Sequence, residues 1–352
     1  MTSDVARRAI VPIDPEAARA ARMRINALTK PLGSLGRIEE LAVTLCAIAG
    51  RVIDRPYGTK AILIGAGDHG ITAEGVSAYP AEVTPQMVAG FLGGHAAINA
   101  FARTVGADVF VANFGVREPL GVHPALIDVL VGHGTANFAR GDAMRAEDVD
   151  LALAAGIAAL DDVLARAAYD VVALGEMGIG NTTSAAAIVA ALTGASAAET
   201  TGRGTGIDDE RLAHKRRVVE AAVAPLRGAA WTTVARAVGG FEIVGLAGAI
   251  LGAASRRIPI VLDGYIAAAG ALLARAIAPE AIGYCIAAHR SQEPGHRIAL
   301  EALGLEPLLD LGLRLGEASG AALALPLVEA ASRMLCEMRT FAEAGVSEAA
   351  GS

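Results

Sequence analysis

The sequence contains little cysteine and few aromatic side chains. Its three cysteines, Cys46, Cys285 and Cys336, are odd in number and far apart, so they suggest neither a disulfide framework nor a zinc site. The histidines do not supply metal ligands either, because none shows an H-x-x-x-H or cysteine–histidine spacing. We therefore expect no metal site, and the sparse cysteine fits a reducing cytoplasm.

Long apolar runs are missing as well, although 53% of the 352 residues are hydrophobic. The run at 243–254 is too short for a membrane span, and the run at 258–288 is interrupted by Asp263, Arg275 and Glu280. The N-terminus lacks the charged and then apolar pattern of an export signal. The formal net charge is -7 and the lysines and arginines are scattered, so we expect no nucleic-acid surface. The sequence predicts a cytoplasmic small-molecule protein with a large core and no membrane contact.

The order of apolar and glycine-rich segments indicates an α/β fold. Helical patterns cover 17–51, with a break at 30–36 where Ser34 or a neighbour could cap the second helix, and return after 311. Between them, short β-rich runs alternate with alanine-rich helical segments. Each run is followed within two residues by glycine, aspartate, asparagine or histidine. The runs span 61–65, 108–112, 170–174, 259–262 and 282–287.

We predict a mostly parallel sheet with helices on both faces, plus a small helical subdomain formed by both chain ends. The predicted units are 55–312, which is α/β, and 1–54 together with 313–352, which is helical. Length alone allows one large domain with a satellite or two domains. Because ligands bind at the carboxyl ends of parallel strands, the site should be assembled from several loops.

The segment 171–184 carries the strongest local indication of function. An apolar strand runs into a glycine-rich turn and then an alanine-rich helix, a geometry that binds phosphate. Its spacing resembles the nucleotide-triphosphatase loop, but Asn181 stands where that loop needs a lysine, so a monophosphate is favoured. Glu176 is expected inside the turn, which indicates chemistry beside the phosphate. A magnesium-dependent nucleotide-hydrolysing enzyme and a non-enzymatic binder of a phosphorylated ligand are the alternatives.

Further polar clusters have both a functional and a structural interpretation. The loop at 201–206 could close over a phosphorylated sugar or be an ordinary loop, and 291–296 could bind an anion or be a polar turn. Asp68 and Asp263 each follow a predicted strand, where aspartate can be functional or can cap the next helix. Glu317 lies between glycines before the C-terminal helix. It can be a dipole partner of that helix or, where an apolar pocket raises its pKa, a general base.

Together these segments resemble the nicotinate-nucleotide:dimethylbenzimidazole phosphoribosyltransferases of cobalamin lower-ligand synthesis. The resemblance spans nearly the whole chain, through KPLGSLG at 30–36, GDHG at 67–70, EVTPQM at 82–87, the glycine turn at 175–183, GRGTG at 202–206, SQEPGH at 291–296 and LGEASG at 315–320. It implies a homodimer that needs no metal ion or other cofactor, with a Rossmann-like sheet whose unit, 55–312, binds nucleotide and base. It also implies that Glu317 is the general base and that Gln86 and Met87 lie near the aromatic base. The nucleotide site would comprise Glu176, Gly178, Gly180, Asn181, Gly204, Lys215 and Ser291.

The implied reaction converts nicotinate mononucleotide and 5,6-dimethylbenzimidazole into α-ribazole 5′-phosphate and nicotinate. Nicotinate leaves as a neutral ring nitrogen, so only the attacking base needs help, and it gives a proton to Glu317. Glu176 could stabilise the oxocarbenium character at C1′. The backbone amides of 178–181 together with Lys215 would hold the phosphate in place. The sequence leaves open whether a benzimidazole, a purine or a phenol is the preferred acceptor.

Overall fold

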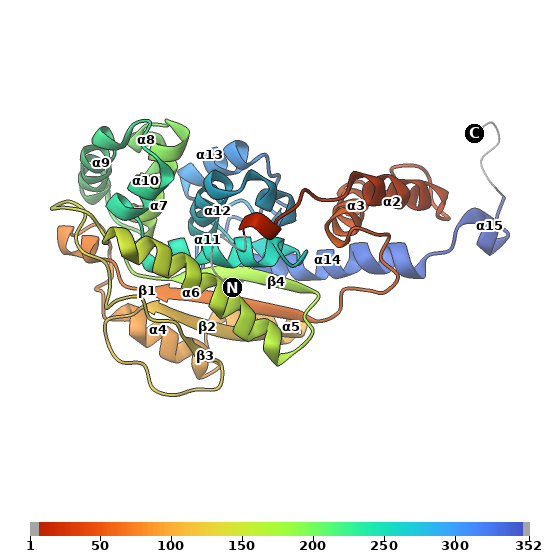
Figure 1. Ribbon diagram of the computed structural model, residues 1–352, viewed down its shortest axis with the longest axis horizontal. Coiled ribbons are helices and arrows are strands. Elements are labelled where there is room, and N and C mark those ends of the chain that lie inside the picture. The colour runs from red at the N-terminus through yellow and green to blue at the C-terminus, as the bar shows by residue number, and fades with distance from the viewer. Residues whose placement is uncertain (1–6, 348–352) are drawn as a thin grey trace.

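The computed structural model describes residues 7–347 and is built around a six-stranded sheet whose neighbouring strands are all parallel. The strands are β1 (Lys60–Gly67), β2 (Ala107–Gly115), β3 (Leu126–Asp128), β4 (Val171–Met177), β5 (Ile260–Leu262) and β6 (Cys285–Ala287). Their spatial order is β3-β2-β1-β4-β5-β6 (Figure 1), which is the order of the doubly wound Rossmann fold. The predicted fold class is confirmed.

Helices cover both faces of the sheet. Successive side chains of a strand point to opposite faces, so Ala61 and Leu63 of β1 enter one core while Ile62 and Ile64 enter the other. The first core is covered by α6 (Ala146–Arg166), α7 (Asn181–Thr193), α10 (Trp231–Val238), α11 (Phe241–Ala254), α12 (Tyr265–Ile277) and α13 (Pro294–Leu303). The second is covered by α4 (Val83–Leu92), α5 (Ala97–Val105) and α14 (Ser319–Glu337). Two further helices, α8 (Ala197–Thr200) and α9 (Asp209–Val223), pack on α7.

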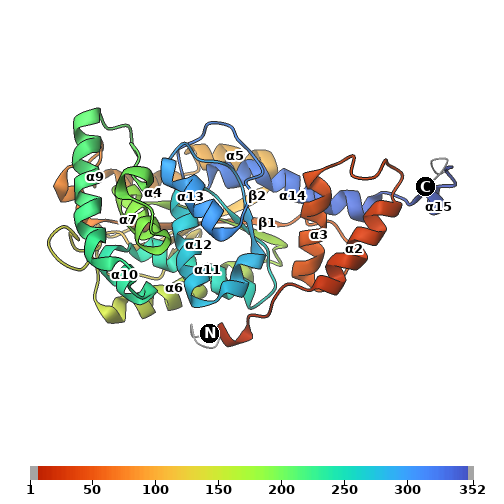
Figure 2. The ribbon, with the colours of Figure 1, turned by 90° about the horizontal axis from the view of Figure 1, so that it is seen from above.

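Helices from the two ends of the chain lie together at one end of the molecule. Here α2 (Pro15–Ala27) and α3 (Arg37–Ala49) lie beside the second half of α14, and α15 (Phe341–Ala344) follows (Figure 2). Their buried side chains belong to the second core, which continues onto the sheet. We propose the boundaries at residues 55 and 312 as the division between the two units; residues 1–6 and 348–352 of the helical unit lie outside the described part.

Several expected elements differ from those observed. The three-residue β3 was not predicted, because so short a strand leaves no alternation to recognise. The run at 282–287 is a strand only over β6, since Pro279–Tyr284 forms a 3-10 helix. Ser34 does not cap α3: Gly36 occupies the N-cap position without a side-chain bond, and Glu39 accepts the Leu35 amide instead (3.0 Å).

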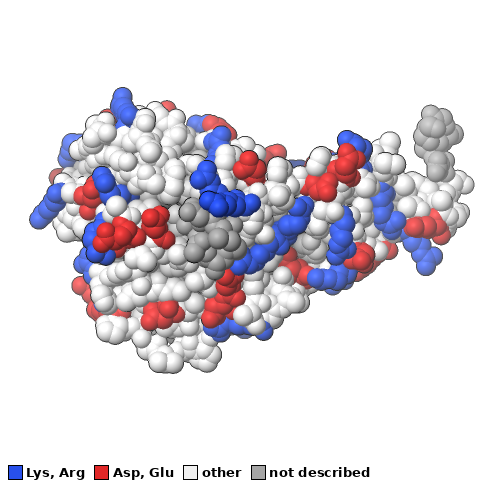
Figure 3. All heavy atoms as spheres, in the orientation of Figure 1, with Lys and Arg blue, Asp and Glu red and all other residues white. Residues whose placement is uncertain are grey.

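Helix length and surface charge can be described for residues 7–347. None of the helices there combines the length and apolar character that a membrane span requires. The face shown in Figure 3 carries acidic and basic side chains interspersed.

Candidate active site

The strand order reverses between β1 and β4, so their carboxyl ends meet at the topological switch point of the sheet. Such a switch point is where doubly wound folds bind their ligands. The loop that begins with Asp68 leaves β1 there, and the glycine turn leaves β4 beside it. The predicted site residues of segment 176–181 therefore lie where the fold itself favours a ligand.

The glycine turn is shorter than expected. β4 continues through Met177, because its backbone pairs with β1 as far as that residue, so Glu176 lies in the strand and not in the turn. Gly180 has φ +96° and directly precedes α7. Gly178 must lack a side chain, because a Cβ there would overlap the carbonyl oxygen of Gly67.

Part of the expected anion-binding backbone is already engaged. The amide of Ile179 donates to Thr84 Oγ1 at 3.1 Å, and that of Asn181 donates to the carbonyl of Gly178 at 3.0 Å. A phosphate would therefore depend on the other amides of the turn and on the dipole of α7.

A buried polar network packs against the glycine turn. His69 Nε2 lies 2.5 Å from Glu242 Oε1, and His69 Nδ1 lies 3.0 Å from Ser184 Oγ. A Cβ on Gly178 would lie 3.2 Å from the His69 ring, so the network forms the floor of the turn. Neither Glu242 nor Ser184 was predicted, although a single carboxylate in the apolar run 241–254 was a usable signal. Asp68 has a structural role, since its Oδ2 accepts the Arg117 amide at 2.8 Å.

Two carboxylates meet at the carboxyl end of β4. Glu176 accepts a hydrogen bond from the side-chain amide of Asn181, and Gly316 packs directly on its carboxyl group. Burial, together with the charges of Asp263 and Glu242, raises the pKa of Glu176 well above its usual value. The next residue along from Gly316 is Glu317, whose charge acts in the same direction.

Glu317 sits in a buried turn just before α14. Its φ is +61°, and only 6% of its surface is exposed. Burial raises its pKa to about 7, which suits a group that takes up a proton near neutral pH. The expectation of a raised pKa is confirmed, and the structure places Glu317 next to Glu176.

A second group of predicted residues forms around Gly204. Gly204 donates its amide to Glu293 Oε1 at 2.8 Å, and a Cβ on it would lie 3.2 Å from Lys215 Nζ. Lys215 is fully buried and donates to Thr182 Oγ1 at 2.8 Å, next to the glycine turn. Burial lowers its pKa to about 8. No carboxylate within residues 7–347 lies within ion-pair distance of Lys215, so the cation can accept an anionic ligand.

The remaining predicted residues, Ser291, Gln86 and Met87, lie on two other segments. Ser291 follows β6, and its amide donates to His296 Nδ1 at 2.9 Å. Gln86 is exposed and Met87 half-buried on α4. The bond from Ile179 to Thr84 places the first turn of this helix against the glycine turn. Thr84 was not singled out from the sequence, since an isolated threonine carries no specific signal.

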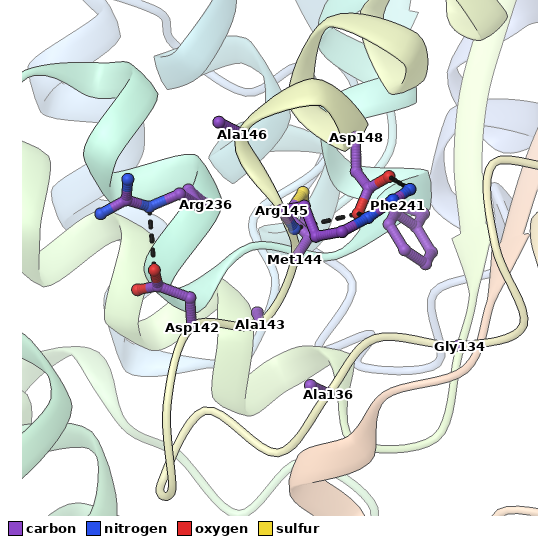
Figure 4. Close-up of a pocket in the computed structure, with 10 residues that line it drawn as sticks. All are labelled: Gly134, Ala136, Asp142, Ala143, Met144, Arg145, Ala146, Asp148, Arg236 and Phe241. Carbon is purple, nitrogen blue, oxygen red and sulfur yellow. Dashed lines mark hydrogen bonds and ion pairs between the residues drawn. The ribbon is translucent and has the colours of Figure 1, made fainter.

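Two cavities in the described part of the chain are lined by residues other than the predicted site residues. One of about 470 Å³ is lined by Phe241, backbone of the 134–146 loop, and two ion pairs, Arg145 with Asp148 and Arg236 with Asp142 (Figure 4). Another of about 290 Å³ lies between α3 and β6. Neither contains a predicted site residue.

Comparison with known proteins agrees with this geometry. A family model described as Phosphoribosyltransferase matches residues 10–346. A nicotinate-nucleotide–dimethylbenzimidazole phosphoribosyltransferase from Chloroflexus aggregans is 52% identical over 345 residues, covering 96% of each chain. A protein of the same name from Geobacter sulfurreducens is 50% identical over 347 residues, again 96% of each chain. The crystal structure of CobT from Thermus thermophilus matches with TM-score 0.92 and 49% identity, over 95% of this chain and 100% of that one.

The doubly wound fold and the family model make this chain an α/β phosphoribosyltransferase. Identity near 50% over nearly the full length is more specific. The chain belongs to the family of nicotinate-nucleotide–dimethylbenzimidazole phosphoribosyltransferases, and the resemblance drawn from its motifs is confirmed.

Proposed function

We propose that this enzyme transfers the phosphoribosyl group of nicotinate mononucleotide to 5,6-dimethylbenzimidazole, giving α-ribazole 5′-phosphate and nicotinate for the cobalamin lower ligand. The names of its relatives support the substrates. The observation that carries the proposal is the position of Glu317: a buried carboxyl with a pKa of about 7, held beside Glu176 at the end of β4.

The reaction needs a base and no acid. The bond between C1′ and the cationic pyridinium nitrogen breaks, and its electron pair stays on that nitrogen, so nicotinate leaves with a neutral ring nitrogen. One nitrogen of the benzimidazole forms the new bond to C1′ from the opposite face, which inverts the β linkage to α. Its other nitrogen loses a proton, and Glu317 accepts it.

Glu176 stabilises charge at C1′ in this proposal. In the ligand-free protein its raised pKa favours the neutral acid. A bound pyridinium cation favours the carboxylate, so the nucleotide itself creates the anion that stabilises the oxocarbenium character of the transition state. The bond from Asn181 orients the carboxyl group.

The remaining predicted residues hold the substrates. Lys215 and the glycine turn bind the phosphate, with Gly178 and Gly180 allowing close approach of the backbone. Gly204 and Ser291 border the ribose side, and Gln86 and Met87 contact the aromatic base. Positioning of this kind brings C1′ in line with the attacking nitrogen.

We also propose that the enzyme is a cytoplasmic homodimer. Leu32 and Leu35, in the loop between α2 and α3, are 71% and 41% exposed, and adjacent exposed leucines are typical of a contact surface. Sedimentation at several concentrations tests the dimer.

A turnover assay tests the function. The protein is incubated with nicotinate mononucleotide and 5,6-dimethylbenzimidazole, and released nicotinate and the α-riboside are separated by chromatography. We expect both products in equal amounts, with and without a chelator. Release of nicotinate without the riboside would indicate a hydrolase. Binding without either product would indicate a non-enzymatic binder, and magnesium-dependent loss of phosphate from ATP a nucleotide-hydrolysing enzyme.

A further inference from the structure

The turn that carries Glu317 has an unusual backbone. Gly316, Glu317 and Ala318 have φ values of +81°, +61° and +61°. Glycine adopts this left-handed region freely, but a residue with a Cβ is strained there. Such a conformation persists only where surrounding groups fix it. The direction of the Glu317 carboxyl therefore depends on whatever holds this turn.

The helix that follows the turn has no cap of its own. The N-cap residue of α14 is Ala318, which has no side-chain oxygen, although the first amides of a helix need acceptors. Asp263 supplies the acceptor from the loop after β5. Its Oδ1 accepts the Ala321 amide at 2.9 Å, and the nearby backbone amides of Gly320 and Ala318 favour the ionised form of this carboxyl.

Asp263 is itself tightly held. It is 2% exposed, and His289 Nε2 lies 3.7 Å from its Oδ1. Gly320 packs on the ring of His289, where a Cβ would overlap. On the other side of the turn, Gly175 of β4 packs on the backbone of Ala318. The turn is thus confined between two strands, and Asp263 provides its polar anchor.

Asp263 does not cap the helix next to it. α12 begins at Tyr265 after an N-cap glycine without a side-chain bond. The Asp263 carboxyl instead accepts a hydrogen bond from α14, 58 residues further along the chain. We infer that Asp263 is a positioning residue, which holds the left-handed turn of residues 316–318 and thereby aims Glu317 at the substrate. This inference rests on the proposed function.

Two substitutions of graded severity test the inference by steady-state kinetics. Asp263→Ala removes the acceptor, and we expect kcat to fall about 100-fold, the effect of displacing a reacting group by about 1 Å. Asp263→Asn keeps an oxygen acceptor but loses the stronger, charge-assisted bonds, so kcat should fall only about tenfold. KM for nicotinate mononucleotide should stay within about threefold, because Asp263 contacts the turn and not the nucleotide site.

Hydrogen exchange of the peptide covering 314–323 gives a readout that does not depend on catalysis. Exchange should be fastest in Asp263→Ala, slower in Asp263→Asn and slowest in the wild type. Should the alanine variant fail to fold, the asparagine variant alone decides, by its kcat and its exchange. Unchanged kcat and exchange in a folded Asp263 variant would overturn the inference, as would equal losses in both variants.

Asp170 offers a matched control at the amino end of β4, the end opposite the proposed site. Its Oδ2 likewise accepts two backbone amides, those of Gly58 and Thr59, each at 3.0 Å. Asp170→Ala should lower stability but leave kcat per folded molecule unchanged; an equal loss of kcat would show that any buried anchor gives the effect and would overturn the inference. Glu317→Gln is assayed in parallel. Wild-type turnover in Glu317→Gln would contradict the proposed function, because Glu317 would then not be the base. If Glu317→Gln is impaired but Asp263→Ala turns over normally, the proposed function stands and only the inference about Asp263 is contradicted.

Discussion

Gly175 and Ala318 are in direct backbone contact, although they lie far apart in the chain: a Cβ on Gly175 would lie 2.6 Å from the Cα of Ala318. The absence of a side chain at Gly175 therefore allows the turn with Glu317 to reach the end of β4. Because Glu176 is the next residue in the strand, this single contact brings the two carboxylates together.

Gly175→Ala should displace the turn that carries Glu317. We expect kcat to fall about 100-fold and the free energy of unfolding to fall by about 1–3 kcal/mol, as for an overpacked core. Turnover assays and denaturant titration measure the two effects. Gly58→Ala is the control, because a Cβ there would meet no atom within 4 Å. Wild-type kcat in Gly175→Ala would show that the contact does not position the base.

Glu317→Gln preserves the shape of the side chain but removes its ability to accept a proton. We expect kcat to fall about 10²–10⁴-fold, the usual contribution of a general base. Glu301→Gln, an exposed residue of α13, should have no effect. If nicotinate release in Glu317→Gln matched the wild type, Glu317 would have no part in the mechanism.

The pH dependence of turnover should report the same group. Glu317 can accept a proton only when ionised, and its pKa is raised to about 7. We therefore expect kcat to rise with pH and to level off above about 7 to 8. Initial rates across buffers of constant ionic strength test this. A profile that levels off below pH 5 would mean that an unperturbed carboxylate is the base.

Through Glu317, the free energy of unfolding should fall as the pH rises, whereas kcat should rise. Its folded-state pKa, about 7, lies above the ordinary value of 4.5, so folding favours the protonated form. The stabilising contribution is complete below about pH 4.5 and is lost as the pH rises through 7. Glu317→Gln cannot ionise and escapes this loss. Denaturant titrations at pH 5 and pH 8 should show the variant gaining stability relative to the wild type at the higher pH, and a constant difference would contradict the shift.

Lys215→Ala should weaken nucleotide binding more than catalysis. The buried ammonium lies beside Gly204 and the start of α7, where the proposal places the phosphate. We expect KM for nicotinate mononucleotide to rise about tenfold or more, with a smaller change in kcat. Arg211→Ala, which removes an exposed cation from the same helix, controls for the loss of positive charge. An unaltered KM would place Lys215 outside the site.

Local features of the chain were readable because their physical cause is local. Short apolar strands, a glycine turn and an alanine-rich helix after it depend on neighbouring residues, and each is present, although the turn is shorter than predicted. The glycines around Glu317 marked it as a candidate, whereas its role as the base came from the resemblance to the family. The parallel sheet followed from the alternation of strands and helices.

The predictions from sequence were wrong or incomplete where contacts between distant segments determine the local structure. Glu176 was expected in the turn, but pairing with β1 extends β4 through Met177. Glu242 and Ser184 meet at His69 from helices whose sequences do not indicate that they are neighbours.

The sequence by itself therefore determined the fold class and the family, and it supplied the residues proposed for the site. Only the tertiary structure decided how Glu317 is held, because the groups that hold it come from other strands. Asp263 could equally have capped the helix beside it, and Gly175 could have been an ordinary strand glycine. Because α14 packs against β4 and β5, Asp263 and Gly175 both contact the same strained turn, residues 316–318. Such contacts form only when segments distant in the chain are brought together by burial of the core.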